Sequence, residues 1–168
     1  GTRMALYFAV WKALQPLSEE ERQKALQQIM DWAGSRPEPR LSHRPMTKEE
    51  IPVLASGGLL SIGAHTVNHP FLSAHSVDIQ KQEIEQSKSC LEQILNHEVS
   101  TFAYPFGDYN RQTLTLVKDA GFVCACSTEE ETVWRRSDGY QLPRLNVLDW
   151  DAGEFEEKLL RWFPTNVH

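Results

Sequence analysis

From about residue 44 onward the sequence alternates between short apolar runs and longer amphipathic stretches, and this rhythm constrains the fold more than any other feature. Strands are predicted at residues 59–64, 99–104, 122–128 and 142–147, and helices at residues 47–58, 77–95, 110–121 and 151–163. Such alternation predicts parallel strands joined by right-handed helical crossovers, with ligands gathering where the strands end. The predicted fold class is therefore α/β.

The first part of the chain follows a different pattern. Residues 5–33 are predicted to be helical, with a capping box formed by Ser18 and Glu21 and a stop at Gly34. A proline-rich segment, residues 35–45, has no periodicity and is predicted to be an exposed connection. We therefore divide the chain into a helical segment with its connection, residues 1–43, and an α/β domain, residues 44–168.

Length and charge exclude several classes of protein. A chain of 168 residues is large enough for one globular domain with a core. Its 17 basic and 23 acidic residues leave a net charge of -6, which disfavours nucleic acid as a partner. No apolar run approaches the roughly 20 residues of a membrane helix, and the first ten residues lack the order of a signal peptide. Either the protein is cytoplasmic or this N-terminus is not the native one, and the three cysteines are expected to be buried or half-buried thiols.

Two histidines follow the predicted strand at residues 59–64. His65 and His69 are spaced four apart, with the small residues Gly63 and Ala64 before them and Pro70 after. Catalytic zinc usually has three protein ligands and one open position, so this pair is at most part of a metal site. The alternative is that both are ordinary surface histidines.

Two further segments carry candidate functional residues. A strand running into Pro105, Phe106 and Gly107 must turn sharply, and such a turn can direct a backbone N–H at a ligand. An ordinary loop with core-packed aromatics is the alternative. Arg144 lies among apolar residues of the last predicted strand, where a buried guanidinium would need a partner, either a structural ion pair or a carboxylate of the site.

The segments "HTVNHP" and "FAYPFG", separated by a long helix, resemble the second and third motifs of the polysaccharide deacetylase family of metal-dependent carbohydrate esterases. The resemblance covers residues 44–163 and implies a distorted (β/α) barrel of seven strands, here partial and missing its first strands. It implies His65 and His69 as ligands of Zn²⁺ or another divalent transition metal, and Pro105 and Phe106 as the oxyanion-binding turn. The implied reaction removes acetyl groups from N-acetylated polysaccharides or oligosaccharides.

The sequence departs from this family in three places. It contains no Asp-Asp pair, which in the family supplies the general base and the third metal ligand. Ala103 stands where the third motif usually has arginine, and Arg144 is a candidate to replace it. The closing Leu-x-His motif has no counterpart. We therefore interpret the chain as the C-terminal portion of a deacetylase, and we expect weak metal binding and no useful deacetylation by this chain alone.

Two alternatives remain open at this point. One is a relative that keeps the fold and binds glycan without chemistry, and the other is an unrelated α/β interaction domain with incidental histidines. Because an incomplete barrel exposes strand edges and apolar surface, a homodimer is also expected.

Overall fold

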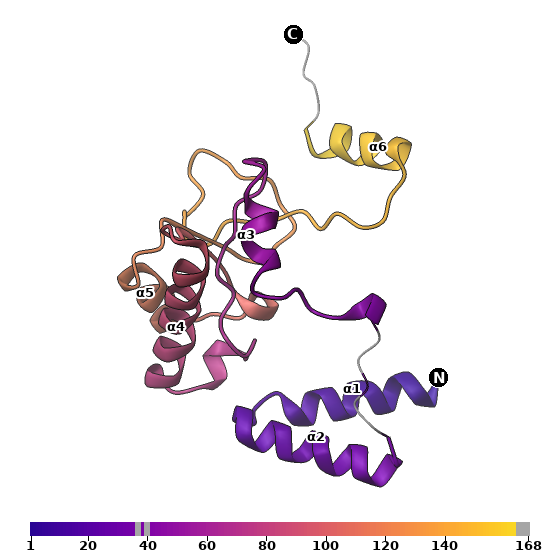
Figure 1. Ribbon diagram of the computed structural model, residues 1–168. Coiled ribbons are helices and arrows are strands. Elements are labelled where there is room, and N and C mark those ends of the chain that lie inside the picture. Colours follow the sequence, from indigo (N-terminus) through magenta and orange to yellow (C-terminus); the bar gives the residue numbers. More distant parts are fainter. Residues whose placement is uncertain (36–37, 39–40, 164–168) are drawn as a thin grey trace.

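The structure is a computed structural model that describes residues 1–35, 38 and 41–163 (Figure 1). Two helices, α1 and α2, form an antiparallel hairpin at one end of Figure 1, and α6 follows an extended segment at the other. The elements in chain order are α1 (Thr2–Leu14), α2 (Glu19–Ala33), η1 (Leu41–His43), α3 (Glu50–Ala55), η2 (Leu72–Ala74), α4 (Val77–Leu95), β1 (Thr101–Ala103), η3 (Pro105–Gly107), α5 (Arg111–Asp119), β2 (Cys124–Cys126) and α6 (Ala152–Trp162).

The capping box predicted for α2 is confirmed, whereas the helix predicted at residues 47–58 spans only Glu50–Ala55 and begins without a side-chain cap. Ser18 and Glu21 form the capping box of α2, and Gly34 ends that helix in the left-handed region at φ 60°. Asn110 caps α5 with Thr113, and Asp151 caps α6 with Glu154. Such caps succeed because they satisfy backbone N–H groups locally, with no help from tertiary contacts.

The parallel strand pairing predicted from the alternation is also confirmed. Strands β1 and β2 pair in parallel, with Phe102 opposite Ala125. One isolated parallel bridge adds a neighbouring segment on each side of this pair. Ala64 bridges to Phe102 of β1, and Leu142 bridges to Cys126 of β2. The described residues thus hold four parallel segments side by side, of which only the two central ones are strands.

The strands predicted at residues 59–64 and 142–147 are therefore wrong in extent. In the first, Leu59 is 95% exposed and only Ala64 pairs with β1, because nothing covers the earlier residues. In the second, Pro143 follows the bridging Leu142 and has no N–H to continue the ladder. Both segments still run beside the sheet, which places the residues that follow them at one edge.

The core lies between this sheet and helices α4 and α5. It consists of Ala64, Leu72, Ile84, Val99, Phe102, Tyr104, Val117, Phe122 and Ala125. On α4, Ile84 belongs to the core and Leu91 and Leu95 pack against it, whereas Val77 at its first turn is 40% exposed. Helix α4 therefore has a firmly buried face directly beneath the segment that carries the two histidines.

Several surface features differ from the sequence predictions. Cys90 is exposed, although the three cysteines were expected to be at least half-buried. His75 has a buried Nε2 with no hydrogen-bond partner among the described residues. Trp32 and Trp134 are 86% and 67% exposed and so lie outside the core. Within the part of the chain described, no helix has the length and apolar character needed to cross a membrane.

Candidate active site

His65 is held at the edge of the sheet by its neighbours. Ala64 donates its N–H to Thr101 O and accepts from Ala103 N, both at 2.9 Å, which joins the segment to β1. A Cβ at Gly63 would lie 2.6 Å from Thr101 Oγ1, so only glycine permits this close approach. The predicted role of the small residues before His65 is thereby confirmed.

The imidazole of His65 has a defined tautomer. Its Nδ1 lies 2.7 Å from Ala103 O, the carbonyl at the end of β1. A carbonyl oxygen only accepts, so Nδ1 carries the proton and donates, and Nε2 of the neutral ring keeps its lone pair. A backbone carbonyl behind one nitrogen commonly orients a histidine whose other nitrogen binds a metal.

The segment between the histidines is strained. Thr66 and His69 both have positive φ, at 62° and 53°, and neither is glycine. A β-branched residue in this region is an outlier, and each such residue costs about 1–3 kcal/mol. The Thr66 hydroxyl accepts from the His69 N–H at 3.0 Å, which closes a tight turn. This turn brings the rings of His65 and His69 to 4.7 Å between centroids.

A buried carboxylate of α4 holds the turn from below. Glu83, only 9% exposed, accepts from Val67 N and Asn68 N at 2.8 Å each through Oε2. Its Oε1 accepts from Asn68 Nδ2 at 2.7 Å. Arg22 of α2 contacts the same turn by donating to Asn68 O at 2.9 Å. We therefore assign Glu83 as a positioning residue, because it satisfies three donors of the strained turn at once.

The second predicted segment forms the turn after β1. Pro105 is buried at its start, and Phe106 has φ 59° and ψ 6°. Gly107 follows at φ 68°, where a Cβ would meet Thr128 Oγ1 at 2.0 Å. Gly107 N donates to Tyr104 O and Asp108 N to Pro105 O, but the Phe106 N–H has no acceptor among the described residues. An unused, rigidly held N–H is what an oxyanion donor requires.

The two segments meet through their aromatic rings. The His69 and Phe106 rings lie 4.4 Å apart between centroids in an edge-to-face arrangement. Phe106 in turn stacks on Phe71 at 4.0 Å with an angle of 4°. The structure therefore brings together His65, His69, Pro105 and Phe106, four of the five residues proposed from the sequence.

The histidine pair matches part of a metal donor set. Burial, followed by the charge of His65, lowers the pKa of His69, which favours the neutral ring that a metal needs. Within the described ranges no cluster of three or more His, Cys, Asp or Glu is placed to hold an ion. Asp108, two residues after Phe106, is engaged elsewhere, because its two carboxylate oxygens accept hydrogen bonds from Ser73 at 2.6 and 2.7 Å. The donors present thus fit two ligands of a zinc site, with a third still required.

Arg144 is the fifth proposed residue, and it lies two residues after the bridge between Cys126 and Leu142. Its Nε donates to Ser127 O at 2.8 Å, and its backbone N–H donates to Glu129 O. It is exposed and has no ion pair among the described residues, so the expectation of a buried, paired guanidinium is wrong. The Ser127 carbonyl accepts one hydrogen bond from the guanidinium, and the other guanidinium N–H groups are left to solvent.

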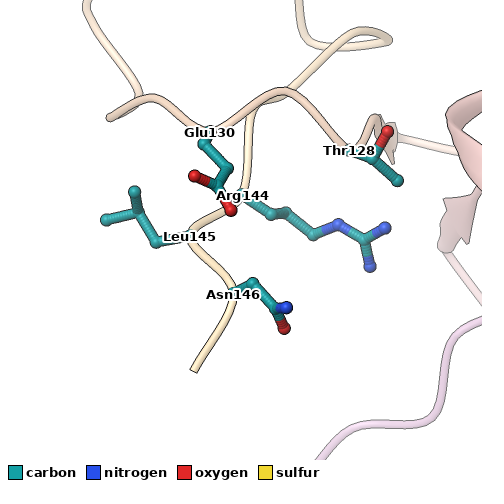
Figure 2. Close-up of a pocket in the computed structure, with 5 residues that line it drawn as sticks. All are labelled: Thr128, Glu130, Arg144, Leu145 and Asn146. Atoms are coloured by element: carbon teal, nitrogen blue, oxygen red, sulfur yellow. The ribbon is translucent and has the colours of Figure 1, made fainter. Parts of the chain in front are cut away.

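Figure 2 shows the hollow that Arg144 lines with Thr128, Glu130, Leu145 and Asn146. The guanidinium extends toward Thr128, the residue that packs against Gly107. Arg144 therefore approaches the Phe106 turn through Thr128, and its two terminal guanidinium nitrogens donate no hydrogen bond to the described residues. The hollow has a volume of about 350 Å³.

Comparison with known proteins defines the class to which this fold and site belong. The family model described as polysaccharide deacetylase matches residues 9–125, and the chain belongs to that family. This membership excludes the interpretation of an unrelated interaction domain.

Individual relatives agree with this assignment. The poly-beta-1,6-N-acetyl-D-glucosamine N-deacetylase of Staphylococcus aureus is 28% identical over 125 residues, covering 70% of this chain and 42% of the relative. The structure of the Streptococcus pyogenes deacetylase PplD in complex with acetate has a TM-score of 0.63 at 28% identity, covering 70% of this chain and 52% of that one. IcaB from Ammonifex degensii has a TM-score of 0.61 at 20% identity, over 75% of this chain and 56% of that one, which supports the fold. The chain spans about half or less of the length of these relatives.

Sequence reasoning missed three residues that the structure places around the site. Glu83 supports the histidine turn, and Trp11 and Arg22 reach it from the N-terminal hairpin. One signal for Glu83 was present, because Gln80, Glu83 and Ser87 repeat at helical spacing on the buried face of α4. Trp11 and Arg22 carried no signal, since their contacts depend on how the hairpin docks.

Proposed function

We propose that this chain carries the histidine and oxyanion-turn part of a metal-dependent hydrolase site that removes N-acetyl groups from N-acetylglucosamine-type polysaccharides or oligosaccharides. The observation that carries the proposal is the convergence of His65, His69 and the Phe106 turn, with the His65 tautomer set by Ala103. The substrate class is supported by the Staphylococcus aureus relative, whose name gives poly-beta-1,6-N-acetyl-D-glucosamine as its substrate.

Each residue has a distinct role in this proposal. His65 and His69 hold a divalent metal such as zinc through neutral imidazoles, and the bound metal would activate water and polarise the acetamide carbonyl. The Phe106 N–H donates to the oxygen of that carbonyl as negative charge develops on it. Pro105 fixes the start of the turn, and Arg144 steadies a carboxylate base from the flank of the same turn.

The catalytic set within this chain is incomplete. The sequence contains no Asp-Asp pair and no Leu-x-His motif after Arg144. We propose that residues 44–168 form part of a distorted (β/α)7 barrel without its first strands, and that residues 1–43 form a separate helical segment. On this basis the chain binds metal weakly and does not deacetylate at a useful rate by itself. A homodimer through exposed apolar surface stays a prediction, which light scattering of the purified chain checks.

Zinc binding and acetate release test the proposal together. We expect calorimetry to show weak zinc binding that is lost in His65→Ala and His69→Ala but retained in His97→Ala, whose side chain lies in a different loop. Acetate release from N-acetylglucosamine oligomers should stay at background. Robust acetate release would contradict the proposal that the catalytic set is incomplete. Zinc affinity that is unchanged in both histidine variants would contradict the proposed metal site.

A non-catalytic glycan-binding relative is the second candidate. It is favoured by the absence of a three-ligand metal cluster from the described residues. This candidate is supported over the first if the chain binds the oligomers and if neither oligomer binding nor zinc binding changes in His65→Ala or His69→Ala.

A further inference from the structure

The N-terminal hairpin, which the proposed chemistry does not use, contacts the candidate site at its turn end. Trp11 of α1 lies 5.9 Å from both Phe71 and Phe106 between ring centroids, edge-to-face in each case. Arg22 of α2 adds the hydrogen bond to Asn68 O in the histidine turn. Both helices of the hairpin are thus attached to the residues that carry His69 and the oxyanion turn.

Hairpin and site together enclose a small hollow. Trp11, Leu14 and Arg22 line it from the hairpin, and His69, Phe71 and Phe106 line it from the site. Its volume is about 110 Å³. This volume is small beside the roughly 300–1,000 Å³ of a typical ligand pocket, so the hollow suits a small substituent of a larger ligand.

The chemistry of this hollow favours an uncharged, partly apolar group. Four of the six residues named carry an aromatic ring or an aliphatic side chain, namely Trp11, Leu14, Phe71 and Phe106. Arg22 is already paired with Glu19 and donates to Asn68 O. Trp11 is 39% exposed and Phe106 is 40% exposed, so both aromatics also reach the rim. If a small substituent of a ligand fills the hollow, the larger part of that ligand must therefore lie against the rings of Trp11 and Phe106.

We propose that Trp11 is a specificity-determining residue that packs against the apolar face of the N-acetylated sugar ring whose acetamido group lies at His69 and Phe106. This inference rests on the proposed function, because it takes the same site and the same substrate class. It assigns the hairpin a role in substrate selection, in which the indole forms one wall of the site.

Trp11 variants and an oligosaccharide titration test this assignment. N-acetylglucosamine oligomers and their deacetylated counterparts are added to the ¹⁵N-labelled chain, and the indole N–H signal of Trp11 is identified by its loss in Trp11→Phe. We expect this signal to shift with the acetylated oligomer. Trp11→Ala should weaken binding about 3- to 10-fold, as expected for the loss of one aromatic contact, and Trp11→Phe should weaken it less.

Trp32→Phe is the matched control, because Trp32 lies on the same hairpin, is 86% exposed and does not line the hollow. It should leave binding unchanged, and circular dichroism checks that the hairpin helices persist in every variant. Equal affinities in wild type, Trp11→Ala and Trp11→Phe would overturn the assignment. So would the lack of any binding to the wild-type chain at millimolar oligomer.

The two proposals fail separately. If zinc binds through the histidines but the Trp11 signal and the affinity do not respond to oligomer or variant, only the assignment of Trp11 fails. If oligomers bind through Trp11 while zinc binding does not depend on His65 and His69, the metal-dependent function fails and the sugar contact stands.

Discussion

Replacing Glu83 with glutamine tests whether the histidine turn depends on the buried carboxylate beneath it. Oε2 of Glu83 accepts from two backbone N–H groups and Oε1 from the Asn68 side chain. Glutamine keeps the shape and one carbonyl oxygen for the two N–H groups, and the Asn68 amide can rotate to present its oxygen to the new NH2 group. The substitution therefore removes charge while it retains the hydrogen-bond pattern.

The magnitude follows from the two backbone hydrogen bonds. A hydrogen bond to a charged group contributes about 1.5–3 kcal/mol and a neutral one about 0.5–1.5 kcal/mol, so Glu83→Gln should lower the free energy of unfolding by about 2 kcal/mol. Glu83→Ala leaves three donors without their acceptor and should cost more than about 3 kcal/mol. Zinc binding by the histidine pair should weaken by about tenfold in Glu83→Gln, as for other residues that orient metal ligands.

Urea unfolding followed by circular dichroism measures the change, and Glu85→Gln is the control. Glu85 lies on the same helix but is exposed and pairs only with Lys81 at 3.8 Å, so its loss should change stability by less than about 0.5 kcal/mol. Equal unfolding free energies for Glu83→Gln and Glu85→Gln would refute the reasoning, because they would show that the turn does not depend on the buried charge.

Three further predictions concern other parts of the fold. Gly107→Ala should destabilise the protein by about 1–3 kcal/mol in urea unfolding, because its φ is 68° and a Cβ would strike Thr128, whereas Gly57→Ala, with open space around it, should have little effect. The pKa of Glu50 is lowered to about 2 by Arg44 and then by the Thr47 N–H, so this contact should be complete above pH 4.5 and lost as pH falls through about 2; a carboxyl NMR titration with a midpoint near 4.5 would contradict it. At pH 8 a thiol reagent should modify exposed Cys90 first and Cys126 slowly, because burial raises the pKa of the Cys126 thiol, and equal rates would show that the thiol is not shielded.

The site was predictable to the extent that its residues belong to local motifs. The spacing of His65 and His69 and the Pro105–Phe106 turn each lie within a few residues of one another, and both follow segments of the sheet. Parallel strands end at the same edge, so the predicted parallel arrangement was enough to expect that the two motifs would meet. The ring contact between His69 and Phe106 agrees with that expectation.

For Arg144, the prediction of a buried side chain from the sequence was wrong. Apolar neighbours suggested burial, but the segment pairs with the sheet only at Leu142, and the guanidinium of Arg144 lies exposed beside Thr128. Hydropathy along a sequence reports what could be buried, and the number of partners available in the fold decides what is buried.

The sequence by itself determined the capping box of α2, the parallel pairing and the two site motifs, because caps, periodicity and turn residues act over a few positions along the chain. Only the tertiary structure decided that Glu83 supports the histidine turn and that Trp11 borders the site. These contacts join residues more than a dozen positions apart, and they depend on the rotation of α4 and the docking of the hairpin, which local propensity does not encode.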